Sequence, residues 1–139
     1  MLQRPRYDNE YYNTKVYNEL SADLIFVFGS NLRGIHGAGA AKIAMQDYGA
    51  VLGKGEGLYA KSYAIPTKDR HIATLPLEVI NRYIVRFNEF TQIASHSFSF
   101  YVTPVGTGLA GYKHREIAPM FKGAKNCWFP DVWKSYLNN

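Results

Sequence analysis

The sequence predicts an α/β protein in which a largely parallel β-sheet lies between layers of helices. Strand-like apolar runs alternate with helical patterns, residues 24–28 are apolar throughout, and two glycine-rich turns each follow a strand. An uninterrupted apolar strand is typical of a sheet that is covered on both faces. With 139 residues, 47% of them hydrophobic, the chain predicts a single domain over residues 1–139, since that length can bury a core of its own.

The first half of the chain alternates strand and helix. Residues 24–28 predict an interior strand that ends at Gly29, where the first glycine-rich turn begins. Residues 40–48 are rich in alanine and predict a helix. A connection with several glycines over 51–57 then leads to a second strand over 62–67.

The second half continues the same pattern. Apolar residues at helical spacing predict a long helix over 77–94, and small polar residues alternating with large apolar ones predict a strand over 97–103. A short helix over 115–121, a short strand over 127–129 and a final helix over 132–137 complete the order. Right-handed crossovers place the loops after parallel strands at one end of a sheet, so both glycine-rich turns should meet at its carboxyl edge.

The segment before the first predicted strand differs from the rest. Residues 1–21 hold Tyr7, Tyr11, Tyr12 and Tyr17 among polar residues without a clear period. We interpret this segment as an N-terminal arm packed on the body of the domain, because tyrosine can bury its ring while its hydroxyl group stays in contact with solvent. A dimer contact or a surface on which bases stack is the alternative.

Composition restricts the class of partner and the compartment. The net charge of +5 favours anionic partners through long-range attraction. Cys127 is the only cysteine, so the chain can form no internal disulfide. No stretch reaches the roughly 20 apolar residues of a membrane span, and the first residues lack the apolar core of a secretion signal. We expect a cytoplasmic protein with no membrane contact, and neither a metal nor a cofactor, because no metal-ligand spacing occurs.

Two glycine-rich turns, residues 29–40 and 104–112, predict a phosphate cradle. Glycine lets backbone N–H groups approach an anion closely, and a helix that starts at the turn adds a partial positive charge. Basic residues near the turns would suit a phosphorylated ligand, and an ordinary basic surface is the alternative. These basic residues are Lys61, Lys68, Arg70, Lys113, His114 and Arg115.

Residues 106–111 also match the dinucleotide fingerprint G-x-G-x-x-G, and Asp131 follows at about the required distance. That fingerprint belongs in the first βαβ unit of a sheet. Here only one short strand and a terminal helix follow it, so a Rossmann-type site is a minor alternative.

In order and spacing, three segments resemble macrodomains: residues 31–41, which contain Gly34-Ile35-His36-Gly37-Ala38-Gly39-Ala40-Ala41, residues 62–66 and residues 103–112. The similarity covers about residues 23–121 and is greatest to an uncharacterised macrodomain-like group of bacteria and phages. The resemblance implies a three-layer α/β/α sandwich with a mostly parallel mixed sheet. It also implies binding of ADP-ribose or a related nucleotide diphosphate derivative and, in some members, hydrolysis of ADP-ribosyl esters or of ADP-ribose 1″-phosphate.

Carried over by position, the resemblance implies that Asn31 contacts the distal ribose, that residues 37–40 and 106–112 hold the diphosphate, and that Tyr112 lies at the distal ribose side. An amide suits ribose hydroxyls because it both donates and accepts, and stabilising a turn is the alternative for Asn31. No acidic residue matches the family's usual adenine contact, so the base stays open. The expected ligand-binding residues are Gly29, Ser30, Asn31, Gly37, Ala38, Gly39, Ala40, Gly106, Thr107, Gly108, Leu109, Ala110, Gly111 and Tyr112.

Asn31 and His36 are the candidate catalytic residues. His36 adjoins the first turn, and imidazole changes charge near neutral pH. Asp69, His71 and His114 are further titratable candidates, and a solvated loop histidine is the alternative interpretation for each histidine. No catalytic triad order accompanies these residues, but positioning and the substrate's own phosphates can suffice for hydrolysis. If the protein is an enzyme, the resemblance implies a hydrolase that acts on ADP-ribose derivatives.

Two other functions stay open beside binding of an ADP-ribose-like small molecule. A nucleic-acid-binding module would use the basic surface and the tyrosine-rich arm, and its affinity would fall steeply with salt. A noncatalytic protein that sequesters a nucleotide signal would bind the same ligand and form no product.

Overall fold

The computed structural model describes residues 6–8 and 23–137. Its sheet has the strand order β1-β6-β5-β2-β4-β3. Neighbouring strands pair in parallel, except β3 and β4, which are antiparallel. The sheet is therefore mixed and mostly parallel, and the predicted fold class is confirmed. The strands are β1 (Arg6–Asp8), β2 (Leu24–Asn31), β3 (Gly57–Tyr59), β4 (Ser62–Lys68), β5 (Ser99–Val102) and β6 (Cys127–Pro130). The helices are α2 (Gly39–Asp47), α3 (Leu77–Ala94), α4 (His114–Ile117) and α5 (Lys134–Leu137), with 3-10 turns η1 (Ala118–Phe121) and η2 (Asp131–Trp133).

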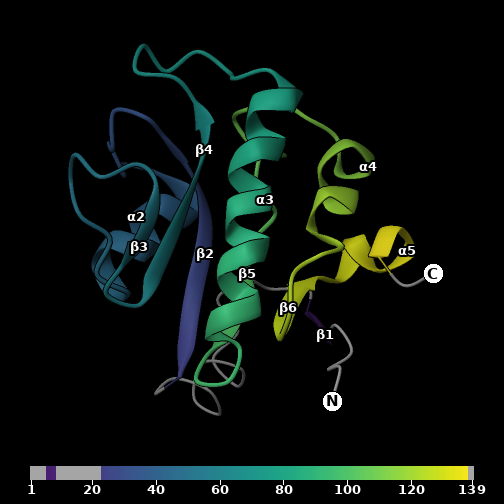
Figure 1. Cartoon of the computed structure of the whole chain (residues 1–139). Coiled ribbons are helices and arrows are strands. Elements are labelled where there is room, and N and C mark those ends of the chain that lie inside the picture. The colour runs from purple at the N-terminus through teal and green to yellow at the C-terminus, as the bar shows by residue number, and fades with distance from the viewer. Residues whose placement is uncertain (1–5, 9–22, 138–139) are drawn as a thin grey trace.

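Helices cover both faces of the sheet, with α2 on one side and α3, α4 and α5 on the other (Figure 1). Strand β2 lies in the middle and explains the continuous apolar run. Its Ile25 and Val27 pack into the cluster on the α3 side, whereas Leu24, Phe26 and Phe28 pack into the cluster on the α2 side. The chain thus forms the three layers that the resemblance implied.

The larger cluster, on the α3 side, is built from aromatic rings. The Phe87 ring of α3 lies edge-on to Phe100 of β5 and to Phe121, with centroids 5.5 and 5.8 Å apart. The Phe121 ring also lies 5.3 Å from Trp133, which is fully buried. Aromatic pairs of this kind stabilise a core beyond the area that they bury. They connect the long helix to the end of the chain.

The first strand is longer than predicted. Instead of ending at Gly29, β2 continues to Asn31, because Gly29, Ser30 and Asn31 pair with Ile65, Pro66 and Lys68 of β4. The register shifts between Ser30 and Asn31, which marks a bulge at the edge where the strand ends. Because Ser30 pairs with Pro66 and Asn31 with Lys68, the extra residue of the bulge is Thr67 of β4.

Strand β1 also departs from the prediction. Within the segment that we interpreted as an arm, Arg6–Asp8 pair in parallel with β6 at the edge of the sheet. The Tyr7 ring lies 6.4 Å from Phe129, and the Arg6 guanidinium lies 4.7 Å above the Trp128 ring. The remainder of the arm, with Tyr11, Tyr12 and Tyr17, lies outside the described residues.

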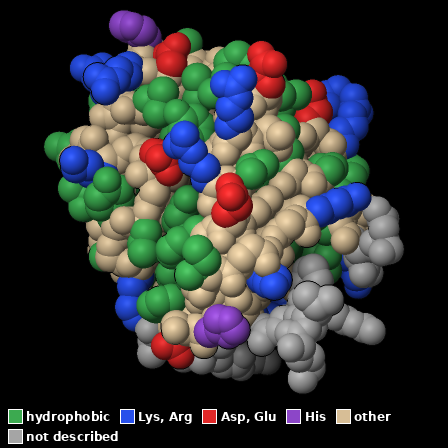
Figure 2. All heavy atoms as spheres, viewed as in Figure 1, with side chains coloured by type: hydrophobic (Ala, Val, Ile, Leu, Met, Phe, Trp, Pro, Cys, Tyr) green, Lys and Arg blue, Asp and Glu red, His purple; other side chains and the backbone are tan. Residues whose placement is uncertain are grey.

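On the face that α3 covers, basic side chains alternate with acidic and apolar ones and do not gather in one patch (Figure 2). In the described part of the chain, none of the helices has both the length and the apolar character that crossing a bilayer requires.

Candidate ligand-binding site

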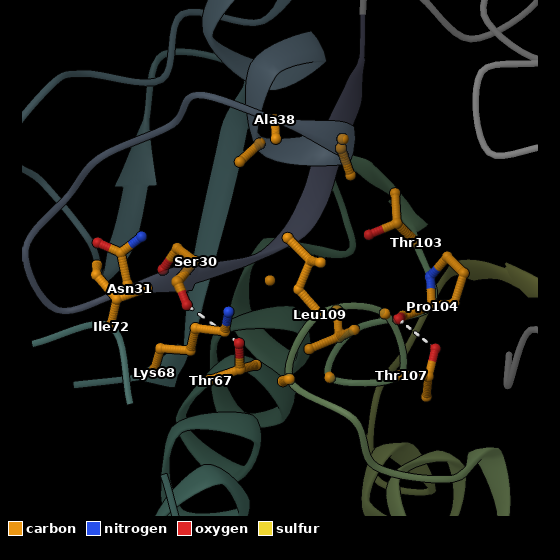
Figure 3. A pocket seen from close by; sticks show the side chains of 18 of the residues that line it. Ser30, Asn31, Ala38, Thr67, Lys68, Ile72, Thr103, Pro104, Thr107 and Leu109 are labelled. Atoms are coloured by element: carbon orange, nitrogen blue, oxygen red, sulfur yellow. Dashed lines mark hydrogen bonds between the residues drawn. The ribbon is translucent and has the colours of Figure 1, made fainter. Parts of the chain in front are cut away.

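A pocket of about 550 Å³ opens where β2, β4 and β5 end (Figure 3). This is the carboxyl edge, at which open α/β sheets bind ligands. Both glycine-rich turns contribute to it, and so does the end of β4. The pocket is lined by Gly29, Ser30, Asn31, Ile35, Gly37, Ala38, Gly39, Ala40, Ala41, Thr67, Lys68, Ile72, Thr103, Pro104, Val105, Gly106, Thr107, Gly108, Leu109 and Ala110.

The floor of the pocket is formed by strand ends that touch one another. Strands β2 and β5 are parallel neighbours, and a Cβ built on Gly29 would lie 3.5 Å from the backbone nitrogen of Gly106. The Thr103 hydroxyl donates to the Val27 carbonyl over 2.8 Å, and the Thr67 hydroxyl donates to the Ser30 carbonyl over 3.1 Å. The floor is therefore made of small residues and of hydroxyl groups that already donate to backbone carbonyls.

Helix α2 opens into the pocket with an uncapped N-terminus. Its N-cap residue is Ala38, which has no side-chain acceptor, and its first turn contains no acidic residue. Gly39, Ala40 and Ala41 all line the pocket. The first N–H groups of a helix lack intrahelical partners and carry about half a positive charge, so this end is suited to an anion. A Cβ at Gly37 or Gly39 would meet only open space.

The second turn faces the same space with another set of donors. Gly106 has φ of 76°, a conformation that favours glycine, and a Cβ there would lie 3.1 Å from Ile117 Cδ1 of α4. Among the described residues, no acceptor bonds the backbone N–H groups of Gly108, Leu109 or Ala110. The pocket thus has free backbone donors both from the start of α2 and from the second turn.

Asn31 lines the pocket and also holds the first turn in place. Its Nδ2 donates to the Ile35 carbonyl over 2.9 Å, and its Oδ1 accepts from the Ile35 N–H over 3.1 Å. Because an amide carries two N–H bonds and two lone pairs, one of each stays available to a ligand. Asn31 can therefore stabilise the turn and contact a hydroxyl at the same time.

His36 is buried behind the first turn and does not line the pocket. Its Nε2 lies 3.1 Å from the Val51 carbonyl oxygen and 3.2 Å from that of Lys54, and its ring meets Phe28 edge-on at 5.3 Å. Nδ1 has no hydrogen-bond partner among the described residues. In this position the imidazole ties the first turn to residues 51–54.

Gly111 and Tyr112 lie beside the pocket without lining it. The Tyr112 hydroxyl donates to the Leu75 carbonyl over 2.6 Å, and the Tyr112 N–H donates to the Gly106 carbonyl over 3.0 Å. The backbone of Tyr112 thus closes the second turn, and its hydroxyl ties that turn to Leu75. The other expected ligand-binding residues line the pocket.

Lys68 is one of the basic residues that we expected near a phosphorylated ligand, whereas Ile72 is a lining residue that we did not single out from the sequence. Lys68 is the last residue of β4 and Ile72 follows that strand, whose end lies beside that of β2 because the two strands pair in parallel. Among the described residues, Lys68 is the only charged one in the lining, and in Figure 3 its ammonium group points toward the middle of the pocket. The signal available in the sequence was Lys68, a charged residue directly after the apolar strand predicted over 62–67.

The other titratable candidates have structural partners. The Asp69 carboxylate accepts the N–H groups of Ala73 and His71, which lowers the pKa of the Asp69 carboxyl group. His114 accepts the Trp133 indole N–H at Nδ1 over 2.9 Å. Among residues 6–8 and 23–137, no cluster of histidine, cysteine and acidic side chains could hold a metal ion.

No family model and no curated protein sequence matches the chain. Solved structures are similar to it in fold. The "Macrodomain of Mycobacterium tuberculosis DarG" superposes with a TM-score of 0.60 at 17% identity, over 91% of this chain and 97% of that one. A protein of unknown function from Bacteroides thetaiotaomicron superposes with a TM-score of 0.58 at 13% identity, over 92% of this chain and 98% of that one.

An alphavirus structure, described as P23pro-zbd, gives a TM-score of 0.60 at 13% identity. It matches 98% of this chain with 23% of its own length, so the similarity concerns one part of that longer protein. Together with the three layers and the order of the strands, these similarities show that the chain has a macrodomain-like fold.

Proposed function

We propose that this protein binds ADP-ribose or a related nucleotide diphosphate derivative in the pocket at the carboxyl edge of its sheet. One observation carries the proposal: the uncapped N-terminus of α2 and the free backbone donors of residues 108–110 line the same pocket. Two sets of N–H donors in one pocket suit a diphosphate, which has acceptor oxygens on all sides.

The charge and size of the pocket support the same ligand. Lys68 adds a positive charge, and no acidic residue in the described part of the chain lines the pocket. The volume of about 550 Å³ lies within the range of small-molecule sites. The macrodomain-like fold and the resemblance of both turns agree with ADP-ribose as the first ligand to test.

The decisive experiment places a negative charge at the helix end. We expect Ala38→Asp to raise the free energy of unfolding by about 1 kcal/mol, because aspartate caps a helix and interacts favourably with its dipole. The same variant should lose affinity for ADP-ribose, since its carboxylate occupies the anion site and repels the diphosphate. Titration calorimetry and chemical denaturation measure the two effects.

Ala38→Ser is the matched control, because serine caps the helix without adding charge. It should gain stability and lose much less affinity than Ala38→Asp. If the unchanged protein gives no heat with ADP-ribose, NAD or ADP at millimolar concentration, the proposed function is wrong. If Ala38→Asp binds ADP-ribose as well as the unchanged protein does, the diphosphate does not lie at α2.

Hydrolysis of an ADP-ribosyl or terminal phosphate linkage is a separate proposal. It is supported by Asn31, which keeps a free N–H and a free lone pair beside Lys68 and could place a water molecule next to the diphosphate. Release of ADP-ribose or phosphate from model substrates should then disappear in Asn31→Ala while the fold persists. Binding without any product would instead indicate a protein that sequesters its ligand.

A further inference from the structure

Ile72, in the loop after β4, has a backbone conformation that isoleucine rarely adopts. Its φ is 64°, which lies in the left-handed region. There the Cβ crowds the following carbonyl oxygen, and a β-branched residue is a clear outlier. The other non-glycine residues with positive φ in the described chain are Ala60 and Asn126, and neither lines the pocket.

The loop that carries Ile72 is tightly closed by Asp69. The Asp69 carboxylate accepts the His71 N–H over 2.8 Å and the Ala73 N–H over 3.0 Å. The Asp69 N–H donates to the Ala73 carbonyl over 2.8 Å, and the Ile72 N–H donates to the Asp69 carbonyl over 3.1 Å. These hydrogen bonds hold Ile72 in the left-handed conformation.

The same loop is fastened to the second glycine-rich turn. The Thr74 hydroxyl donates to the Ala110 carbonyl over 3.1 Å, and Leu75 accepts the Tyr112 hydroxyl at its carbonyl and donates its N–H to the Thr67 carbonyl. The position of Ile72 relative to the pocket is therefore fixed by bonds on both sides of it.

The Ile72 side chain is not part of the buried core. Its side chain is 40% exposed and belongs to neither buried cluster of the described chain. It lines the pocket instead, close to Asn31 and Lys68 at one end (Figure 3). Strain of this kind concentrates at functional sites, where the surrounding structure enforces it.

We propose that Ile72 determines specificity by packing against the apolar face of a sugar attached to the diphosphate, and so selects nucleoside diphosphate sugars over nucleoside diphosphates. The inference rests on the proposed function and adds to it which end of the ligand is recognised. A pentose has hydroxyl groups and a C–H face. Asn31 and Lys68 supply polar partners for the hydroxyl groups of the sugar. Ile72 supplies apolar contact for its C–H face.

The test is Ile72→Asn, because asparagine tolerates positive φ and removes the apolar surface. Without ligand, this variant should unfold at a higher temperature than the unchanged protein. Its affinity for ADP-ribose should fall about tenfold, and its affinity for ADP should change by less than about twofold. Thermal unfolding and titration calorimetry with the two nucleotides measure these effects.

Two further variants serve as controls. Ile72→Val keeps a β-branched apolar side chain and should recover most of the affinity for ADP-ribose. Ile93→Asn makes the same change in polarity on α3, where Ile93 is 79% exposed and outside the pocket, and should leave both affinities unchanged.

The possible outcomes separate this inference from the proposed function. If the unchanged protein binds neither nucleotide, the proposed function fails and this inference fails with it. Suppose instead that the unchanged protein binds ADP-ribose. If Ile72→Asn binds ADP-ribose equally well, or loses as much affinity for ADP as for ADP-ribose, only the inference on the sugar is overturned. A lower unfolding temperature for Ile72→Asn would show that Ile72 is not strained.

Discussion

At the scale of single residues, Lys68 makes the clearest electrostatic contribution to the pocket. We expect Lys68→Met to weaken ADP-ribose binding about tenfold, since hydrogen bonds to charged groups contribute about 1.5–3 kcal/mol and exposure to solvent reduces this. Methionine keeps most of the length of the side chain and removes the ammonium group, and with it the charge and the N–H donors. Calorimetry at low and high salt should show a smaller salt dependence for the variant.

Lys122→Met is the matched control for Lys68→Met. Lys122 is exposed and does not line the pocket, so the variant loses the same net charge elsewhere on the molecule. Equal losses of affinity in the two variants would mean that the overall charge of the protein attracts the ligand and that Lys68 makes no contact with it.

The sequence predicted the backbone of the candidate site better than its side chains. Glycine-rich turns after strands are local signals, and both turns line the pocket. Lys68 and Ile72 depend on the parallel pairing of β4 with β2, which no local pattern in the sequence reveals. The surroundings of His36 likewise depend on a contact between two loops, the first turn and residues 51–54.

At the scale of elements, strong periodicity was enough to predict the central strands and α3. The predicted strand over 97–103 contains β5, and the predicted helix over 77–94 has the bounds of α3. The short edge strands β1 and β3 were not predicted, because three-residue strands have no recognisable period and form only where a neighbour is available. Tertiary pairing decided those two elements.

The first turn and the connection over residues 51–57 support one another, and His36 is one of the links. The Ser30 hydroxyl donates to the Gly55 carbonyl, and the Gly53 N–H donates to the Gly34 carbonyl over 2.9 Å. We expect His36→Phe to lower the free energy of unfolding by about 1–2 kcal/mol, because it keeps the ring and removes the donor. It should also weaken ADP-ribose binding by loosening the residues that lead into α2. Chemical denaturation and calorimetry measure both effects.

His36→Gln is the informative companion variant. A glutamine amide has two N–H bonds and can donate to the carbonyl oxygens of both Val51 and Lys54. It should therefore recover part of the stability and part of the affinity. If His36→Phe binds ADP-ribose normally, the shape of the first turn does not depend on this link.

At the scale of the whole molecule, the residues that stabilise the fold and the residues that line the pocket lie on different parts of the sheet. The two buried clusters lie on its two faces, whereas the pocket lies at the edge where its strands end. Trp133, Phe121 and Phe129 pack together in the larger cluster and do not line the pocket. Residues in this cluster, apart from Val105, which also lines the pocket, should therefore affect unfolding more than ligand binding.

Tyr63 provides a pH test of that separation. Burial in the larger cluster, together with the nearby Glu56 carboxylate, raises the pKa of the Tyr63 phenol to about 12, although Arg86 acts in the opposite direction. Because the folded protein holds this proton more tightly than the unfolded chain, whose phenol has a pKa near 10, the stability is complete below pH 10. As pH rises from 10 to 12, we expect a loss of about 2–3 kcal/mol.

Tyr63→Phe should remove this part of the alkaline loss, which denaturation at several pH values between 9 and 12 can measure. Burial also raises the pKa of the Cys127 thiol, so both proteins should still lose stability above pH 9 through that group. The comparison therefore depends on the difference between the two curves above pH 10. Identical curves would mean that the Tyr63 phenol ionises as easily in the folded protein as in the unfolded chain, and that the cluster around it admits water.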